Sequence, residues 1–132
     1  MTEEQHQLIE QWLSRARGAI EEAEMLLANQ HLSGAVNRTY DACFYAVTAL
    51  LLTEDQKSDK HSGVLALFDR HWISTQRLPR EMGRFYHEVF GHRQLSEQAD
   101  TLDLGSTSVQ AWLTEAEQFI ELIAAEIARS TA

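Results

Sequence analysis

The run ACFYAVTALLL, near the middle of the chain, restricts the fold more than any other stretch. It occupies residues 42–52, and Asp41 is the only charged side chain between Arg38 and Glu54. A helix formed by this run is apolar on every side, which is typical of a helix enclosed by others. It is also too short to cross a bilayer, because that takes about 20 apolar residues. The sequence therefore predicts a buried central helix.

The remainder of the chain supplies helices to surround it. Apolar side chains recur at the helical spacing of three and four residues, and no stretch alternates as a strand does. We therefore predict a single all-α domain over residues 1–132, a four- or five-helix antiparallel up-and-down bundle. The expected helices are residues 2–29, residues 33–53 capped by Ser33, a short one burying Val64, Leu65, Phe68 and Trp72, one opened by Pro79, and one capped by Ser106 or Ser108.

Composition fits a globular protein, with 44% apolar residues in a chain of 132. The one cysteine, Cys43, lies inside the apolar run, so we expect a buried, unreactive thiol. The amino-terminal stretch MTEEQHQ is polar and acidic, unlike a signal peptide. These features favour a cytoplasmic protein with no membrane association.

Charge is distributed unevenly along the chain. The net charge is −9, yet residues 57–93 carry seven of the eleven basic side chains and sum to +3, which leaves −12 for the remainder. An acidic total argues against general nucleic-acid coating, and no DNA partner is expected. Any anion that binds is expected at the basic middle third.

The apolar stripe of the predicted fourth helix is followed by charged residues on the same face. At about 100° per residue, Arg93 falls near the centre of the face formed by Met82, Phe85, Tyr86, Val89 and Phe90. Glu97 and Asp100 follow on about the same side. A buried arginine without a partner is costly. Two interpretations stay open: a structural ion pair with these carboxylates, or a polar site that binds an anion.

Two further polar clusters interrupt the expected core. Asn37 and Asp41 share a helical face, with Arg38 on the adjacent one; this is either a solvent-facing or interface strip, or the lining of a site. Lys60 and His61 stand at the start of the short third helix. Backbone N–H groups there can help to hold an anion, although such residues are also ordinary caps.

Several chemistries find no support in the sequence. Carboxylate-bridged metal bundles use a Glu-x-x-His pair, but Arg84, Val89 and Phe68 stand three residues before His87, His92 and His71. No serine lies on a glycine-flanked turn, and no glycine-rich phosphate loop is followed by lysine. We expect no metal and no cofactor.

Together the clusters resemble the HEPN domain family, near its small stand-alone bacterial and archaeal members. The resemblance rests on SGAVNRTYDACFYAVTALLL, KHSGVLALFDRHW, LPREMGRFYHEVFGHRQLSEQAD and VQAWLTEAEQFIELI, in that order over about residues 20–125. It implies a bundle that pairs as a homodimer. It also implies a metal-independent endoribonuclease of a toxin–antitoxin or defence module, in some cases neutralised by a nucleotidyltransferase-type antitoxin.

The resemblance assigns roles only where the residues match. Arg93 stands at the arginine of the family's Arg-x(4–6)-His signature, which implies a contact with the scissile phosphate. The matching histidine is missing, because Glu97, Gln98 and Ala99 occupy those positions, and Thr101 replaces a tyrosine typical of the small branch. His61 is then the remaining candidate for proton transfer.

Two functional hypotheses follow. In the first, Arg93 and His61 are catalytic in RNA cleavage, and RNA or a nucleotide is bound by further residues of an inter-subunit cleft: Asn37, Arg38, Asp41, Lys60 and Asp100. In the second, the domain is non-catalytic and binds a nucleotide or a partner protein, such as a minimal nucleotidyltransferase.

Overall fold

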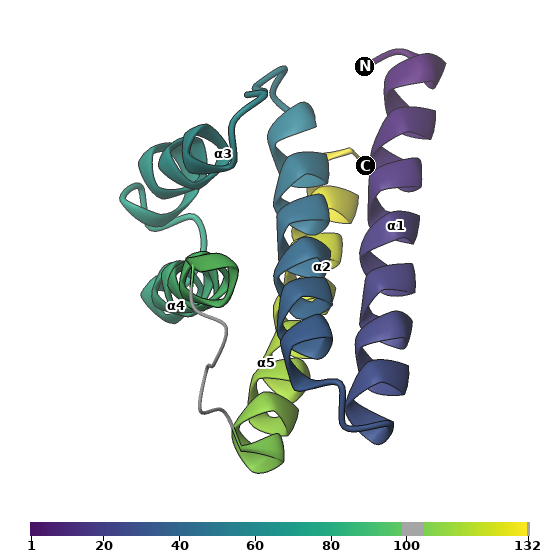
Figure 1. The fold of residues 1–132 in the computed structure, drawn as a ribbon. Coiled ribbons are helices and arrows are strands. Elements are labelled where there is room, and N and C mark those ends of the chain that lie inside the picture. Colours follow the sequence, from purple (N-terminus) through teal and green to yellow (C-terminus); the bar gives the residue numbers. More distant parts are fainter. Residues whose placement is uncertain (99–104, 132) are drawn as a thin grey trace.

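Five α-helices form the computed structural model of this protein, which describes residues 1–98 and 105–131 (Figure 1). The predicted all-α bundle is confirmed, with no strand in those two ranges. The helices are α1 (Glu3–Ala28), α2 (Leu32–Leu52), α3 (His61–Phe68), α4 (Arg80–Gln98) and α5 (Ser106–Ser130), and α3 continues into one π-helical turn, η1 (Asp69–Ile73).

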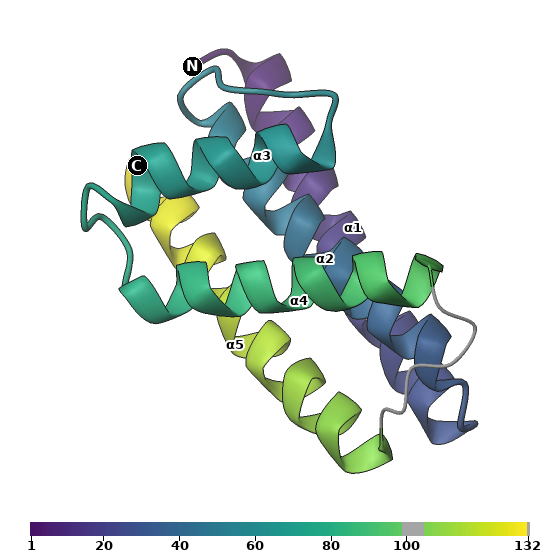
Figure 2. The same ribbon diagram turned by 60° about the vertical axis from the view of Figure 1, so that its left-hand side comes forward.

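Helix α2 lies at the centre of the bundle, as its apolar sequence predicts. It packs against α1, α3, α4 and α5, and none of the other described helices contacts all the rest. Helices α1, α2 and α5 lie lengthwise beside one another, while Figure 2 shows α3 and α4 crossing them on one side. On that side, the start of α3 and the C-terminal end of α4 lie over α2.

The helix starts show where local sequence signals hold. Thr2 caps α1 in a reciprocal capping box, in which its hydroxyl accepts from the Gln5 backbone and the Gln5 side chain accepts from the Thr2 backbone. Pro79 immediately precedes α4, and its carbonyl accepts the first helical hydrogen bond, from Met82 N at 3.0 Å. Both starts agree with the sequence-based prediction.

The predicted cap of α2 is wrong. His31, not Ser33, is the N-cap residue, and it makes no side-chain capping hydrogen bond. The cause is the tight end of α1, where Gln30 takes a positive φ of 62°. The N–H of His31 then bonds to Leu26 O at 2.8 Å, and that of Gln30 to Leu27 O at 3.0 Å. This Schellman closure leaves no room for a longer turn, so α2 begins at once.

The predicted caps of α5 are also wrong. Gly105 holds the N-cap position in an extended conformation, which places Ser106 and Ser108 inside the first turn of α5. The Gly105 carbonyl accepts from Ser108 N at 3.1 Å, so the backbone closes this turn without a side-chain cap.

The core agrees with the predicted apolar stripes. Trp72 and Cys43 are fully buried, and burial raises the pKa of the Cys43 thiol far above its usual value. The stripe of α3 and η1 is buried as expected, and so are the apolar residues of α4 that lead toward Arg93: Met82, Phe85, Tyr86 and Val89.

Candidate functional site

Tyr40, on α2, is the centre around which the candidate site forms. Its side chain is fully buried, and four rings surround it at centroid distances of 5.6–6.1 Å: His61, Phe90, Phe44 and Tyr86. These rings come from α2, α3 and α4, so the cluster lies where the two crossing helices meet the central one.

His61, the first residue of α3, is fixed by two contacts with α2. Its Nδ1 lies 2.9 Å from the Tyr40 hydroxyl, within hydrogen-bond distance. Its imidazole ring stacks face to face on Phe44, with centroids 4.2 Å apart and planes inclined by 4°. The ring is half-buried. The position of His61 is therefore set by packing and hydrogen bonding together.

Arg93, near the end of α4, reaches the same tyrosine from the other side of the cluster. Its guanidinium carbon lies 4.9 Å from the centre of the Tyr40 ring, which is a cation–π contact. The side chain is half-buried, consistent with its predicted place on the inward stripe. Two residues 32 positions apart in sequence, His61 and Arg93, thus meet on Tyr40.

The Tyr40 hydroxyl is protonated at neutral pH. Burial raises the pKa of Tyr40 to about 12, although the positive charge of Arg93 acts in the opposite direction. A protonated phenol can donate or accept a hydrogen bond. It can therefore remain bonded to His61 Nδ1 whether that nitrogen carries a proton or not.

A close backbone approach positions the start of α3. A Cβ atom on Gly63 would lie 2.1 Å from Ser58 Oγ and 2.8 Å from Ser58 Cβ, so only glycine fits. The same hydroxyl accepts from Lys60 N at 3.2 Å. The loop thus folds back over the first turn of α3, with Lys60 exposed immediately before His61.

Arg38 and Asp41 are paired with each other. Arg38 Nη1 lies 2.9 Å from Asp41 Oδ2, and Arg38 Nη2 lies 3.1 Å from Glu22 Oε1 on α1. Their side chains are 26% and 19% exposed, so both reach the surface only in part. Asn37, one turn before Asp41, is half-buried. The structure thus ties Arg38 to Glu22 on α1 and to Asp41 on its own helix.

The carboxylates predicted to hold Arg93 cannot be compared with the structure. Asp100 and the side chain of Glu97 lie outside what the structure describes. His92, next to Arg93, turns to α5 instead, where its ring centroid lies 4.0 Å from that of Trp112. His92 is therefore no part of the Tyr40 cluster.

Tyr40 is the site residue that the sequence-based reasoning did not single out. Tyr40 is an aromatic residue with a polar hydroxyl on a largely apolar helical face, and a buried hydroxyl usually has a hydrogen-bond partner. This feature could have indicated Tyr40 as a site residue. Its partners lie 21 and 53 positions further along the chain, beyond the reach of helical periodicity.

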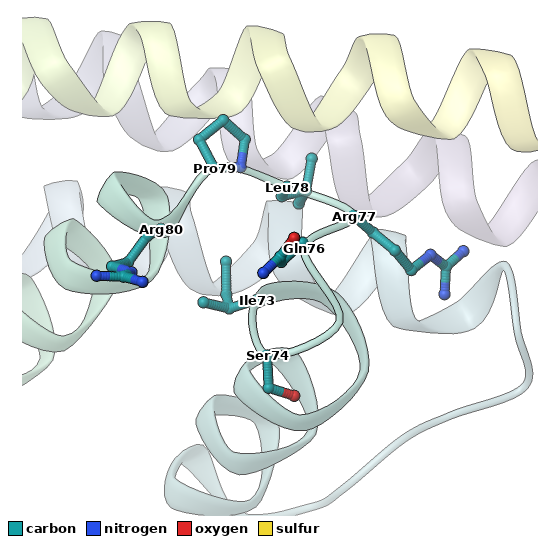
Figure 3. A pocket seen from close by; sticks show the side chains of 7 residues that line it. All are labelled: Ile73, Ser74, Gln76, Arg77, Leu78, Pro79 and Arg80. Carbon is teal, nitrogen blue, oxygen red and sulfur yellow. The ribbon is translucent and has the colours of Figure 1, made fainter.

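A separate pocket of about 520 Å³ lies between η1 and the start of α4. Figure 3 shows Arg77 and Arg80 at its edges, pointing in opposite directions. Arg77 is engaged elsewhere, with Nη1 3.1 Å from Glu54 Oε1 and its guanidinium 3.5 Å from the centre of the Trp72 ring. None of the predicted site residues lines this pocket.

Within the described residues, no group of three or more His, Cys, Asp or Glu side chains is arranged to hold a metal ion. No helix among them is both long enough and apolar enough to span a bilayer.

Comparison with known proteins identifies the family. The model of the HEPN domain matches residues 9–127, so the chain belongs to the HEPN domain family. It is 40% identical over 120 residues to a UPF0332 protein of Thermotoga maritima, covering 91% of each chain. It is 30% identical over 112 residues to a Methanocaldococcus jannaschii protein named "Putative toxin MJ0142", covering 85% of this chain and 76% of the other.

A second relative from the same archaeon, named "Putative toxin MJ0605", is 28% identical over 101 residues. It covers 76% of this chain and 75% of its own length. The chain is therefore a small HEPN protein with relatives named as toxins.

Proposed function

We propose that this protein is the toxin-like member of a toxin–antitoxin or defence module and cleaves RNA without a metal ion. The observation that supports this most directly is the meeting of His61 and Arg93 on Tyr40. The proposal places the protein in the cytoplasm, where its RNA substrate and a nucleotidyltransferase-type antitoxin partner would be found.

The chemistry needs one proton acceptor and one cation. His61 takes the proton from a ribose 2′-hydroxyl as its oxygen attacks the adjacent phosphorus. The P–O5′ bond breaks, the 5′ oxygen leaves with a proton from water, and a 2′,3′-cyclic phosphate remains. The hydroxide formed from that water takes the proton from His61, which restores the base. Arg93 offsets the negative charge that develops on the phosphate oxygens. In the proposed homodimer a second copy adds a second arginine, which strengthens a weak single-cation site.

The direct test is cleavage of a broad RNA panel in EDTA by the wild type and by Arg93→Ala. We expect cleavage by the wild type, and loss of most of it in Arg93→Ala. Arg80→Ala is the matched control, because Arg80 is an exposed arginine at the other end of the same helix. Equal cleavage by the wild type and Arg93→Ala would overturn the role of Arg93. Light scattering on the same samples measures whether the protein is a dimer.

A non-catalytic binding domain is the second candidate, and two observations favour it. The histidine and tyrosine of the family signature are replaced. Arg38, a predicted ligand of RNA or nucleotide, is already paired with Glu22 and Asp41. This alternative predicts no cleavage by any preparation, together with stoichiometric binding to a co-expressed nucleotidyltransferase or to a nucleotide.

A further inference from the structure

We propose that Tyr40 is a positioning residue that holds His61 and Arg93 in register for the same scissile phosphate, with separate roles for its hydroxyl and its ring. This inference rests on the proposed nuclease function and extends it to a residue outside the family's signature motif. Tyr40 does not contact RNA in this assignment, because its side chain is fully buried.

The hydroxyl engages one nitrogen of His61, Nδ1. With Nδ1 held 2.9 Å from the Tyr40 hydroxyl, the assignment gives proton exchange with the ribose to Nε2. Before the reaction, Nδ1–H donates to the phenol oxygen and Nε2 is the base. After Nε2 takes the proton, Nδ1–H donates as before. The hydrogen bond persists through the transfer, so the imidazole does not have to rotate.

Phe44 completes the support of this histidine. Face-to-face stacking at 4.2 Å leaves the imidazole little freedom to tilt out of its plane, while the hydrogen bond to Tyr40 opposes rotation within the plane. Both supports stand on α2, at positions 40 and 44, one helical turn apart. The central helix therefore presents a rigid platform to the first residue of α3.

The Tyr40 ring provides the contact with Arg93, whereas the hydroxyl provides the hydrogen bond with His61. The guanidinium lies over the π-face at 4.9 Å, which restrains its position. A single side chain thus fixes the distance between proton acceptor and cation. Figure 2 shows that α4 crosses α2 on the same side of the bundle as α3.

The two roles separate in mutants. Tyr40→Phe removes the hydroxyl and keeps the ring, so kcat for RNA cleavage should fall about 10- to 100-fold, a part of what a positioned general base contributes. KM should change less than about twofold, because the Arg93 contact remains. Tyr40→Leu removes both supports, so KM should rise as well. Tyr45→Phe, which removes the hydroxyl of another tyrosine on the same helix, should leave both constants unchanged.

A spectroscopic measurement tests the hydroxyl's role without any activity. The ¹⁵N chemical shifts of the imidazole nitrogens report the tautomer of each of the six histidines. The His61 signals are assigned by their absence in His61→Asn. With the assigned tautomer, neutral wild-type protein should show His61 protonated on Nδ1, and Tyr40→Phe should change the tautomer because the hydrogen bond to Nδ1 is lost. Tyr45→Phe should leave the wild-type signals in place.

The outcomes distinguish this inference from the proposed function. Wild-type kcat in Tyr40→Phe, with His61→Asn inactive, would overturn the role of Tyr40 and leave the nuclease intact. If no preparation cleaves RNA, the proposed function fails. The ¹⁵N spectra then decide alone: unchanged His61 signals in Tyr40→Phe would overturn the positioning role, and a changed tautomer would support it. Thermal unfolding verifies that each variant is folded.

Discussion

The guanidinium of Arg93 and the ring of Tyr40 form a cation–π contact at 4.9 Å that links the end of α4 to the central helix. A lysine at position 93 would keep the charge but lose the planar fork that can lie on a ring and grip two phosphate oxygens. We expect Arg93→Lys to cleave RNA at least about tenfold more slowly, a loss of about 1.4 kcal/mol in transition-state stabilisation. Single-turnover rates measure this.

Arg80→Lys serves as the control for charge-preserving substitution on the same helix, and its rate should equal that of the wild type. A wild-type rate in Arg93→Lys would mean that a point charge suffices at this position. The contact with Tyr40 would then have no part in cleavage.

Gly63 is required by the loop that folds over α3. A Cβ atom at this position would lie 2.1 Å from Ser58 Oγ, so Gly63→Ala must displace the loop beside Lys60 and His61. We expect a loss of about 1–3 kcal/mol in the free energy of unfolding, the usual cost of overpacking. Urea denaturation measures it. The loss should be smaller when Ser58 is also replaced by glycine, because both clashing atoms are then gone.

Gly18 provides the matched control in α1. A Cβ atom there would meet no other atom within 4 Å, so Gly18→Ala should stabilise the protein by about 0.5–1 kcal/mol through helix propensity. If Gly63→Ala were equally stabilising, the loop would have to lie away from α3.

The ion pair of Arg77 and Glu54 predicts a pH dependence of stability. A hydrogen bond from Arg77 lowers the pKa of Glu54 below its usual value of 4.5, against the opposing effect of partial burial. A lowered pKa in the folded state means that the pair stabilises the fold above pH 4.5 and loses this effect as the pH falls through the lowered value. The stability difference between wild type and Glu54→Gln should therefore shrink upon acidification.

Urea denaturation at a series of pH values from neutral downward measures this difference. Glu121→Gln is the control, because the pair of Arg17 and Glu121 is longer, at 3.5 Å, and its side chains are 50% and 66% exposed. Such a pair contributes little. A Glu54→Gln difference that stays constant through the acidic range would contradict the prediction.

The sequence predicted what depends on periodicity. The apolar run of residues 42–52 placed α2 at the centre, and the stripe ending at Arg93 was inward as expected. The prediction that Ser33 caps α2 was wrong, because the backbone hydrogen bonds that close the turn at Gln30 set the start of α2. Such a closure depends on backbone conformation rather than on a capping side chain.

The candidate site was predicted only in part for a related reason. His61 and Arg93 were each suspected, but the side chain that joins them belongs to a helix on which Tyr40 looked like ordinary core. Contacts between residues 21 and 53 positions apart follow from how α3 and α4 cross α2, which no local pattern specifies. The sequence indicated His61 and Arg93 as candidates, and the crossing of the helices showed that Tyr40 lies between them.

Cys43 should behave as part of the core rather than as a reactive group. Its side chain is fully buried, and burial raises the pKa of the thiol far above its usual value, so almost no thiolate forms at neutral pH. Because the thiolate is the nucleophile, we expect no reaction with Ellman's reagent in the native state and one equivalent of reaction in urea. Rapid labelling of native protein would mean that α2 separates from its neighbours in solution. Cys43→Ala should keep the fold and abolish labelling under both conditions.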